Sequence, residues 1–209
     1  MSMLASGPDS RRLNPEPCRL TQSEKEHASG QRGFAIWIYG LSGAGKSTLA
    51  ASLERELHRQ GRVTVMLDGD DLRGGLNRGL GFSDTDRTEN LRRAAEVAKL
   101  LVRSGLVVIA AFITPRREHR ALVSTIVGAA DLALVHASAP FAVCARRDPK
   151  GLYAQAAADV LRQFTGRDSA FEPPLDEAGL TLDTSAESVA ESTARLVAYV
   201  TPRLVPPHA

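Results

Sequence analysis

A run of eight residues near the start of the chain has the composition of a phosphate-binding loop. Residues 40–47 read GLSGAGKS, which is the order Gly-x-x-x-x-Gly-Lys-Ser. Glycines let the backbone curl until successive N–H groups point at phosphate oxygens, and the following helix adds its N-terminal dipole. Lys46 can then reach the terminal phosphates, and Ser47 can place its hydroxyl on Mg²⁺. The loop predicts a nucleoside triphosphate site made by Gly40, Gly43, Ala44, Gly45, Lys46, Ser47 and Thr48, with Lys46 as a catalytic cation.

The loop does not identify what receives the phosphate. A chance Gly-rich turn is the plainer alternative, but an apolar run precedes the loop and a helical stretch follows it. Switch GTPases usually carry an N-K-x-D segment on a later strand, and this sequence contains none. Large ATPases need a longer chain than these 209 residues. A small kinase is therefore the leading class.

Two carboxylates follow the second apolar run, in the segment LDGDDLR. Asp68 and Asp70 are two residues apart, and alternate residues of a strand point to the same side of a sheet. We therefore expect both to face the cleft that holds the phosphate loop. One can support Mg²⁺ and the other can accept a proton from an attacking hydroxyl. An acidic turn or helix cap is the alternative, and Asp71 alone fits that description.

The next segment, RGGLNRGLGFSDTDRTENLRR, carries five arginines around Phe82. Arginine offers a planar fork of N–H groups for anionic oxygens, and a Phe on a Gly-flanked loop can stack on a base. A solvated basic loop with one buried Phe is the alternative for any of these residues taken singly. The arginines are Arg73, Arg78, Arg87, Arg92 and Arg93.

The elements that must position these residues alternate between strands and helices. Continuous apolar runs predict buried parallel strands, and a sheet of this kind is covered by helices on both faces. We expect an α/β, three-layer P-loop nucleoside-triphosphate hydrolase-like fold with a mostly parallel, about five-stranded sheet. Residues 1–32 lack hydrophobic periodicity and are expected to be a flexible extension or an arm on a partner subunit; residues 33–204 are expected to form the kinase domain. The strands lie in residues 34–39, 63–70, 106–113, 132–137 and 179–184, and the helices in 47–61, 86–105 and 185–200, the last with Ser185 as N-cap.

Composition excludes several other classes. The net charge of +2 is too small for a nucleic-acid surface, and aromatic residues are too few for a base-stacking platform. No apolar run is long enough to span a membrane, and the first thirty residues lack a secretion signal. Cys18 and Cys144 show no metal or redox spacing and are expected to be free thiols. We expect a cytoplasmic protein without a nucleic-acid or membrane partner.

The sequence resembles the adenylylsulfate kinase (APS kinase) family over roughly residues 32–200. The resemblance rests on LDGDDLRGGLNRGLGFSDTDRTENLRRAAEVAKLL, followed in order by AFITP, RDPKGLY, FTGRDSAFEPP and LTLDT. It implies transfer of the γ-phosphate of ATP to the ribose 3′-hydroxyl of adenosine 5′-phosphosulfate, with Mg²⁺ as cofactor. The products would be 3′-phosphoadenosine 5′-phosphosulfate and ADP. We expect a homodimer, although no residue pattern shows the oligomeric state.

The resemblance also implies roles for individual residues. Asp70 would hold or deprotonate the 3′-hydroxyl, while Ser47 and Asp68 would hold Mg²⁺. Thr114 stands where some relatives have a phosphorylated serine, which makes it a candidate catalytic residue, although direct transfer needs no such intermediate. The sulfate and phosphate of the acceptor would contact Arg73, Arg87 and Asn90, and its adenine would lie between Phe82 and Phe164. Ile113 and Thr114 would line the acceptor pocket. Lys150 would lie in a lid, and Arg147 would lie near the adenine of ATP.

Four departures from the family pattern leave other hypotheses about the function open. Asp71 replaces an Asn, Thr114 replaces a Ser, residues 115–120 read PRREHR, and the lid segment 154–161 is poor in Lys and Arg. The altered lid would suit a kinase of the same fold with another nucleotide-linked anion as acceptor. A non-catalytic nucleotide-binding regulator is the remaining alternative. Its mark would be loss of Lys46, Ser47 or Asp70, and all three are present.

Overall fold

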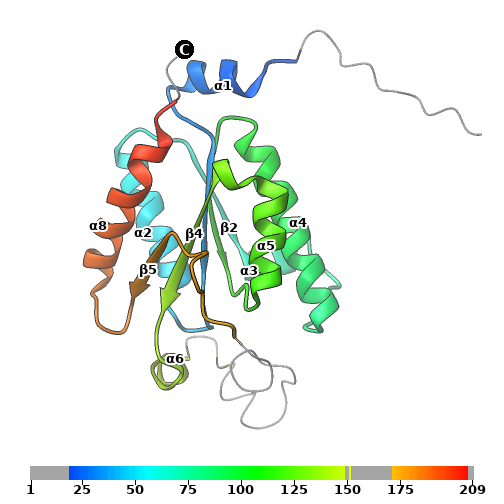
Figure 1. Ribbon diagram of the computed structural model, residues 1–209, viewed down its shortest axis with the longest axis vertical. Helices are drawn as coiled ribbons and strands as arrows, with labels where there is room; N and C mark the ends of the chain where they lie inside the picture. The colour runs from blue at the N-terminus through cyan, green and yellow to red at the C-terminus, as the bar shows by residue number, and fades with distance from the viewer. Residues whose placement is uncertain (1–18, 149–150, 152–170, 207–209) are drawn as a thin grey trace, which may run out of the picture.

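Five strands form one parallel sheet in the part of the chain that the structure describes, residues 19–148, 151 and 171–206 of a computed structural model. The strand order is β2-β3-β1-β4-β5, and every neighbouring pair is parallel. The predicted α/β sheet is therefore confirmed. Because all strands run the same way, their carboxyl ends meet at one edge, at the bottom of Figure 1. The strands are β1 (Phe34–Tyr39), β2 (Thr64–Asp68), β3 (Val107–Phe112), β4 (Leu132–Ser138) and β5 (Leu180–Asp183).

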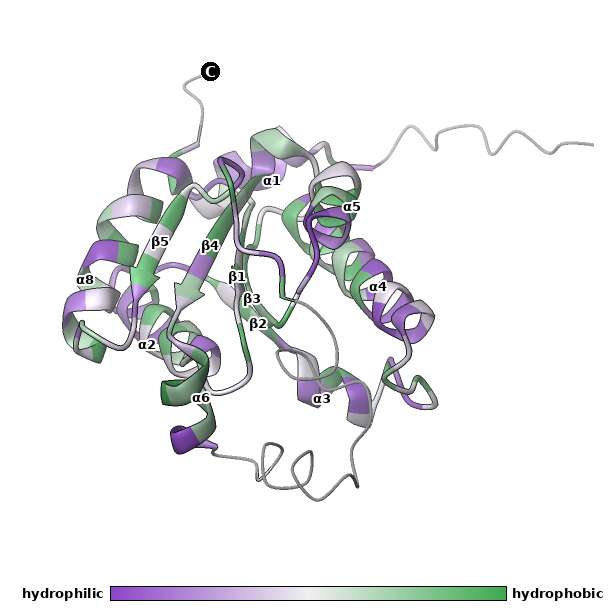
Figure 2. Cartoon of the chain, turned by 60° about the horizontal axis from the view of Figure 1, so that its bottom comes forward, coloured by the Kyte–Doolittle hydropathy of each residue, from purple (hydrophilic) through white to green (hydrophobic). Residues whose placement is uncertain are grey.

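Helices cover both faces of the sheet and give it three layers (Figures 1 and 2). On one side α2 (Lys46–Arg59) packs beside α8 (Val189–Val200), and on the other α4 (Asp84–Val102) packs beside α5 (Arg117–Val127). The alternation along β1 divides the core between them, because successive side chains of a strand point to opposite faces. Ile36 and Ile38 join the layer of α2 and α8, whereas Trp37 and Tyr39 join the layer of α4 and α5.

Shorter helices complete the described chain. They are α1 (Gln22–Ser29), α3 (Gly69–Gly74), α6 (Phe141–Arg147) and the 3₁₀ turns η1 (Ala129–Asp131) and η2 (Thr201–Leu204). Both α3 and α6 lie at the carboxyl edge of the sheet (Figure 1). No helix in the described ranges is both long enough and apolar enough to cross a membrane.

The flexible extension expected for residues 1–32 is wrong for residues 22–32, and residues 1–18 lie outside the described ranges. Thr21 and Glu24 form a reciprocal capping box at the start of α1. The buried carboxylate of Glu26 accepts the Gly33 N–H at 2.9 Å. The buried amide of Gln31 donates to the Gly105 carbonyl at 2.8 Å and accepts the Val63 N–H at 2.8 Å. These bonds anchor the segment to the residues just before β1, β2 and β3.

The N-cap expected at Ser185 is also wrong. The cap of α8 is Ser188, whose hydroxyl and Glu191 form a second capping box. Ser185 instead donates its hydroxyl to Asp183 Oδ1. A Glu three residues after a Ser or Thr marks both true caps in the sequence.

Two glycines lie where chain segments approach too closely for a side chain. A Cβ at Gly33 would lie 2.0 Å from the backbone carbonyl oxygen of Val102, at the end of α4. A Cβ at Gly179 would lie 2.0 Å from the hydroxyl oxygen of Tyr199 on α8. Both positions immediately precede a strand, so the absence of a side chain lets the strand enter the sheet beneath its covering helix.

Candidate active site

One cavity of about 660 Å³ opens at the carboxyl edge of the sheet and brings most of the predicted site residues together. The position is the usual ligand site of a parallel α/β sheet, beyond the ends of its strands. Lys150 and Phe164 lie outside the described ranges, so the structure does not place them. The predicted residues that line the cavity are Gly43, Gly45, Lys46, Ser47, Thr48, Asp68, Asp70, Arg73, Phe82, Arg87, Asn90, Ile113, Thr114 and Arg147.

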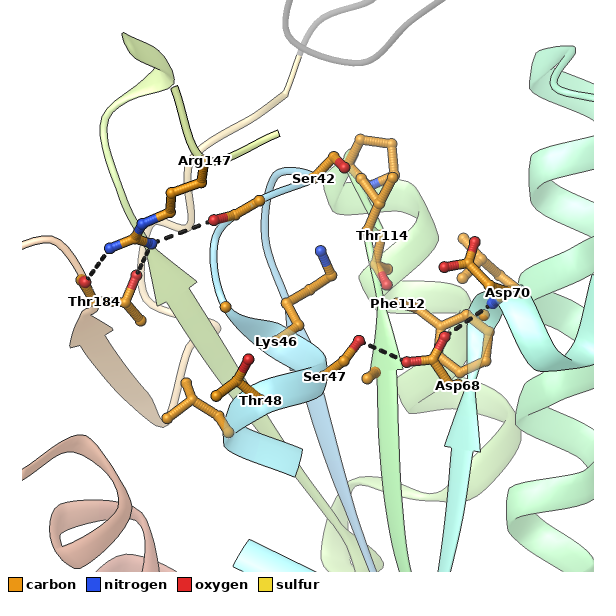
Figure 3. Close-up of a pocket in the computed structure, with 18 of the residues that line it drawn as sticks. Ser42, Lys46, Ser47, Thr48, Asp68, Asp70, Phe112, Thr114, Arg147 and Thr184 are labelled. Atoms are coloured by element: carbon orange, nitrogen blue, oxygen red, sulfur yellow. Dashed lines mark hydrogen bonds between the residues drawn. The ribbon is translucent and has the colours of Figure 1, made fainter. Parts of the chain in front are cut away.

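The phosphate loop runs from β1 into α2 along one wall of the cavity. Gly43 and Gly45 adopt φ angles of 75° and 85°, a left-handed conformation that favours glycine. Lys46 is the first residue of α2, and its Nζ donates to the Leu41 carbonyl at 2.7 Å. The ammonium group therefore lies within the loop itself (Figure 3).

Gly40 and Ala44 do not line the cavity. Their N–H groups donate to the carbonyls of Ile113 and Leu41, each at 3.2 Å, so both groups are used inside the protein. A Cβ at Gly40 would lie 2.2 Å from the Ala137 carbonyl oxygen, which shows how closely the loop packs on β4. The structure gives both residues a packing role, and their predicted contact with ATP stays a prediction.

A hydroxyl and two carboxylates meet where β2 ends. Ser47 Oγ donates to Asp68 Oδ2 at 2.6 Å, and the Asp70 N–H donates to Asp68 Oδ1 at 3.0 Å (Figure 3). The expectation that Asp68 and Asp70 alternate along one strand is wrong, because β2 ends at Asp68 and Asp70 lies in the first turn of α3. Asp68 caps this short helix, and the turn carries Asp70 into the same cavity.

The oxygens of Ser47 and Asp68 fit a magnesium ion. Mg²⁺ prefers hard oxygen ligands and usually keeps several waters and substrate phosphates in its shell, with only one or two protein groups. Within the described ranges no cluster of three or more His, Cys, Asp or Glu forms a complete protein cage. The two oxygens lie next to the phosphate loop. They match a site in which waters and substrate phosphates supply the other ligands of Mg²⁺, and not a site that is closed by protein ligands alone.

The opposite wall carries two arginines and an exposed ring. Arg73 donates to the carbonyls of Leu80 and Gly81 at 3.1 and 2.9 Å, and Arg87 Nε donates to the Phe82 carbonyl at 2.8 Å. Arg73 Cζ also lies 4.5 Å from the centre of the Phe82 ring, which is 47% exposed. Burial lowers the pKa of both Arg73 and Arg87 from its ordinary high value. The wall thus combines positive charge with an accessible aromatic face.

Three further predicted residues line the cavity between these walls. Asn90 is buried on α4, and its Oδ1 accepts from Asn77 Nδ2 at 2.9 Å. Ile113 and Thr114 follow the end of β3. Thr114 is 1% exposed, and its Oγ1 accepts the indole N–H of Trp37 at 2.8 Å. The Thr114 hydroxyl is therefore held in place by the buried indole of Trp37.

Arg147 joins the phosphate loop to the segment between β5 and α8. Its Nη1 lies 3.2 Å from both the Gly43 carbonyl and Thr184 Oγ1, and its Nη2 donates to the Thr184 carbonyl at 2.6 Å (Figure 3). On this side of the cavity sequence reasoning found Arg147 but missed Thr184, although Thr184 ends the LTLDT segment. The other unpredicted lining residues there are Glu187, Val189 and Ser192, which no phosphate-binding pattern includes.

Comparison with known proteins identifies the family. The sequence model described as adenylylsulphate kinase matches residues 32–183. The chain belongs to the adenylylsulphate kinase family. It is 49% identical over 185 residues to an adenylyl-sulfate kinase of Bacteroides fragilis, covering 88% of this chain and 91% of the relative. It is 48% identical over 185 residues to an adenylyl-sulfate kinase of Bacteroides thetaiotaomicron, covering 88% and 92%.

A solved structure in the same family has a similar fold. The APS kinase of Mycobacterium tuberculosis, in complex with AMPPNP and APS, has a TM-score of 0.77 and 43% sequence identity. The alignment covers 81% of this chain and 98% of that chain. The three-layer fold with a phosphate loop is therefore that of the adenylylsulphate kinases.

Three departures from the family pattern can be placed in the structure, and one of them, residues 115–120, leads into the first turn of α5. Asp71 is exposed and is not among the residues that line the cavity, so its negative charge does not enter the wall that Asp70 joins. Thr114 keeps its hydroxyl, but that hydroxyl bonds to Trp37. The charge-poor segment 154–161 lies outside the described ranges.

Three of the five arginines lie away from the cavity lining. Arg92 and Arg93 form ion pairs with Glu89 at 2.7 and 2.8 Å, and Arg78 is exposed. Arg92 and Arg93 lie on α4 and not on a loop, so the alternative of a solvated basic loop fits at most Arg78. Of the two cysteines, Cys18 lies outside the described ranges, and Cys144 is buried on α6, where its Sγ donates to the Ala139 carbonyl at 3.8 Å.

Proposed function

We propose that this chain transfers the γ-phosphate of ATP to the ribose 3′-hydroxyl of adenosine 5′-phosphosulfate. The products are 3′-phosphoadenosine 5′-phosphosulfate and ADP, so the reaction activates sulfate. The observation that carries the proposal is one continuous cavity with the phosphate loop on one wall and Asp70, Arg73, Phe82 and Arg87 on the other. Such a cavity accommodates a triphosphate donor and an anionic nucleotide acceptor face to face.

The charges of the cavity divide the work between its walls. Lys46 acts on the β- and γ-phosphates, and Arg147 lies near the adenine of ATP. Asp70 accepts the proton of the 3′-hydroxyl as that oxygen attacks. Arg73, Arg87 and Asn90 bind the sulfate and phosphate of the acceptor, while Ile113 and Thr114 line its pocket. The proposal also assigns Lys150 to the lid and Phe164 to the second face of the acceptor adenine, opposite Phe82.

Magnesium belongs to the proposal as the cofactor held by Ser47 and Asp68. When bound, Mg²⁺ supplies positive charge that offsets the charge of the phosphate oxygens. The protein's own part is to hold the two oxygens together, as the 2.6 Å bond between Ser47 Oγ and Asp68 Oδ2 indicates.

Direct transfer between the two nucleotides is favoured over a phosphorylated Thr114. A nucleophilic hydroxyl must reach the reacting phosphorus, whereas Thr114 is 1% exposed and its oxygen accepts a hydrogen bond from Trp37. Phosphoryl transfer relies mainly on positioning and charge and needs no covalent intermediate. A homodimer and a cytoplasmic location complete the proposal; light scattering of the purified protein tests the dimer.

The decisive experiment measures ADP release with and without adenosine 5′-phosphosulfate. We expect release to depend on the acceptor, and ATP turnover that ignores it would refute the proposal. Asp70→Asn should keep ATP binding and slow transfer by about a hundredfold or more, because the base is lost.

Asp71→Asn is the matched control for the Asp70 variant. It removes the same charge one residue away, outside the cavity lining, and should leave the rate within a small factor of the wild-type rate. Equal losses in the two variants would contradict the role of Asp70 as base.

A further inference from the structure

Thr114 has an unusual backbone conformation in the wall of the cavity. Its φ angle is +43°, and it alone among the described non-glycine residues has a φ in the left-handed range between +20° and +160°. A β-branched side chain disfavours the left-handed region strongly, and the following Pro115 pushes the preceding residue toward extended conformations. The conformation persists only where surrounding contacts fix it. Residues 113–115 all line the cavity, so whatever fixes Thr114 also shapes that wall.

Trp37 supplies the first contact. Its side chain is fully buried in β1 and stacks on Phe112, with ring centres 4.7 Å apart. Its indole N–H donates to Thr114 Oγ1 at 2.8 Å. The stack fixes the direction of the N–H group, and the N–H group fixes the threonine side chain.

Arg120 supplies the second contact, from α5. Its guanidinium is 1% exposed, and Nη1 lies 3.3 Å from both the Thr114 and Pro115 carbonyl oxygens. Nε and Nη2 donate to Glu177 Oε1 at 3.0 and 2.7 Å, and the group lies over the ring of Tyr39. A buried guanidinium requires partners for its N–H groups, so these bonds hold the Arg120 guanidinium in one orientation.

The same wall is tied to the chain that follows residue 170. The Pro115 carbonyl also accepts the Glu172 N–H at 2.8 Å, and Glu172 Oε2 accepts the Arg117 N–H at 2.7 Å. Together with the ion pair of Arg120 and Glu177, these bonds fix residues 114–117 to residues 172–177.

We infer that Trp37 and Arg120 are positioning residues for the acceptor. Neither lines the cavity; both act through the backbone and side chain of Thr114. The inference rests on the proposed function, because residues 113 and 114 are assigned there to the acceptor pocket. Loss of either contact lets the wall relax from its strained shape, which weakens acceptor binding and leaves the ATP wall unchanged.

Trp37→Phe tests the inference in steady-state kinetics. The substitution keeps an aromatic ring for the Phe112 stack and removes the N–H donor. We expect the KM for adenosine 5′-phosphosulfate to rise roughly three- to tenfold, the effect of one lost buried hydrogen bond. The KM for ATP should stay within about twofold. A purely structural role would lower the melting temperature and leave both KM values unchanged, which would overturn the inference.

Val123→Ala is the matched stability control. Val123 is a fully buried residue of α5, one turn beyond Arg120, and its truncation lowers stability without removing a bond to residues 114 and 115. Arg120→Lys retains the charge but loses the planar fork. Like Trp37→Phe, it should therefore raise the KM for adenosine 5′-phosphosulfate. A rise in the acceptor KM in Val123→Ala as large as in Arg120→Lys would also overturn the inference.

A double-mutant cycle with Thr114→Gly gives the sharpest outcome. Glycine adopts the left-handed conformation without strain and carries no hydroxyl for Trp37 to bind. In the Thr114→Gly background, Trp37→Phe should therefore leave the acceptor KM unchanged. An equal effect of Trp37→Phe in both backgrounds would show that Trp37 does not act through Thr114. Wild-type protein that turns over no adenosine 5′-phosphosulfate would instead refute the proposed function.

A spectroscopic measurement checks the contact without turnover. Trp37 is the single tryptophan of the chain, so its emission reports on this one bond. Thr114→Val removes the acceptor oxygen at nearly constant shape and should shift the emission of the free enzyme. An unchanged spectrum would contradict the bond on which the inference depends.

Discussion

Two ionisable side chains are buried among aromatic rings at the carboxyl ends of β1 and β4. The His136 ring stacks between Tyr39 and Phe171, with centres 5.2 and 5.7 Å away. Burial lowers the pKa of His136 to about 4, and the nearby Arg120 charge adds to the effect while Glu177 opposes it. Burial likewise raises the pKa of Tyr39 to about 12. Both groups are therefore neutral at neutral pH.

The buried neutral His136 makes the free energy of unfolding depend on pH. Its pKa is about 4 in the folded protein and about 6.5 in the unfolded chain. Between these values only the unfolded chain binds the proton, so stability is lost as the pH falls from 6.5 to 4. His136→Gln should flatten this part of the curve, by an amount on the order of 2 kcal/mol at pH 4.5.

Denaturant unfolding at pH 6.5, 5.5 and 4.5 measures this change. His58→Gln, on the exposed surface of α2, is the control and should follow the wild-type curve. A His136→Gln curve parallel to the wild-type curve would show that His136 does not stay neutral in the fold.

Among the secondary-structure elements, α1 depends on one buried side chain that follows it. Gln31 is 1% exposed and bonds to both the N–H and the carbonyl of Val63 and to the carbonyl of Gly105. Gln31→Ala removes the partner of the Val63 N–H and of the buried Gly105 carbonyl, whereas the Val63 carbonyl keeps the Val107 N–H at 3.2 Å. The loss should cost about 2–4 kcal/mol of unfolding free energy. Activity well below the melting temperature should be unchanged, because Gln31 lies away from the cavity.

Chemical denaturation compares Gln31→Ala with Gln60→Ala, an exposed cap residue of α2. The Gln60 variant should lie within about 0.5 kcal/mol of the wild type. Equal stability of the two variants would contradict the anchoring role of Gln31.

The elements differ in how far their sequences predict them. β1 and β3 are continuous apolar runs, buried at every position, and such runs are readily predicted. The apolar period of α5 is broken, because His119 and Arg120 occupy its buried face along with Val123. A search for hydrophobic spacing misses such a helix. The charge of Arg120 can be buried because it pairs with Glu177, which lies 57 residues away in the sequence.

Prediction of the site shows the same division. The phosphate loop is local, so its eight residues predicted its position and its neighbours. Asp70 was placed in the correct cavity for the wrong reason, because a six-residue helix replaced the expected strand end. The bond of Trp37 to Thr114 spans 77 residues and could not be predicted from either sequence segment.

At the scale of the whole molecule, the cavity joins the two helical layers. It takes lining residues from α2 on one face and from α4 on the other, so a ligand there contacts both. A ligand that binds only the folded state stabilises it by RT ln(1 + [L]/Kd), about 2.7 kcal/mol at a hundredfold excess over Kd. With Mg²⁺, AMPPNP should raise the melting temperature by roughly 5–10 °C.

Removal of the metal tests the oxygens of Ser47 and Asp68. EDTA should reduce the thermal shift, and Ser47→Ala should remove most of the part that depends on Mg²⁺. Ser104→Ala, at the opposite edge of the sheet, should retain the full shift. A shift in Ser47→Ala that still responds to EDTA as in the wild type would place the ion elsewhere.

The two close approaches at Gly33 and Gly179 place different limits on how this sequence can diverge. At position 33 the obstacle is the backbone oxygen of Val102, which every residue carries, so no second substitution can make room. At position 179 the obstacle is the phenolic end of Tyr199, which a smaller residue would remove. Relatives should therefore keep glycine at the first position whatever else changes. At the second, a side chain should appear only together with a shorter residue in place of the tyrosine, so that the two sites change as a pair.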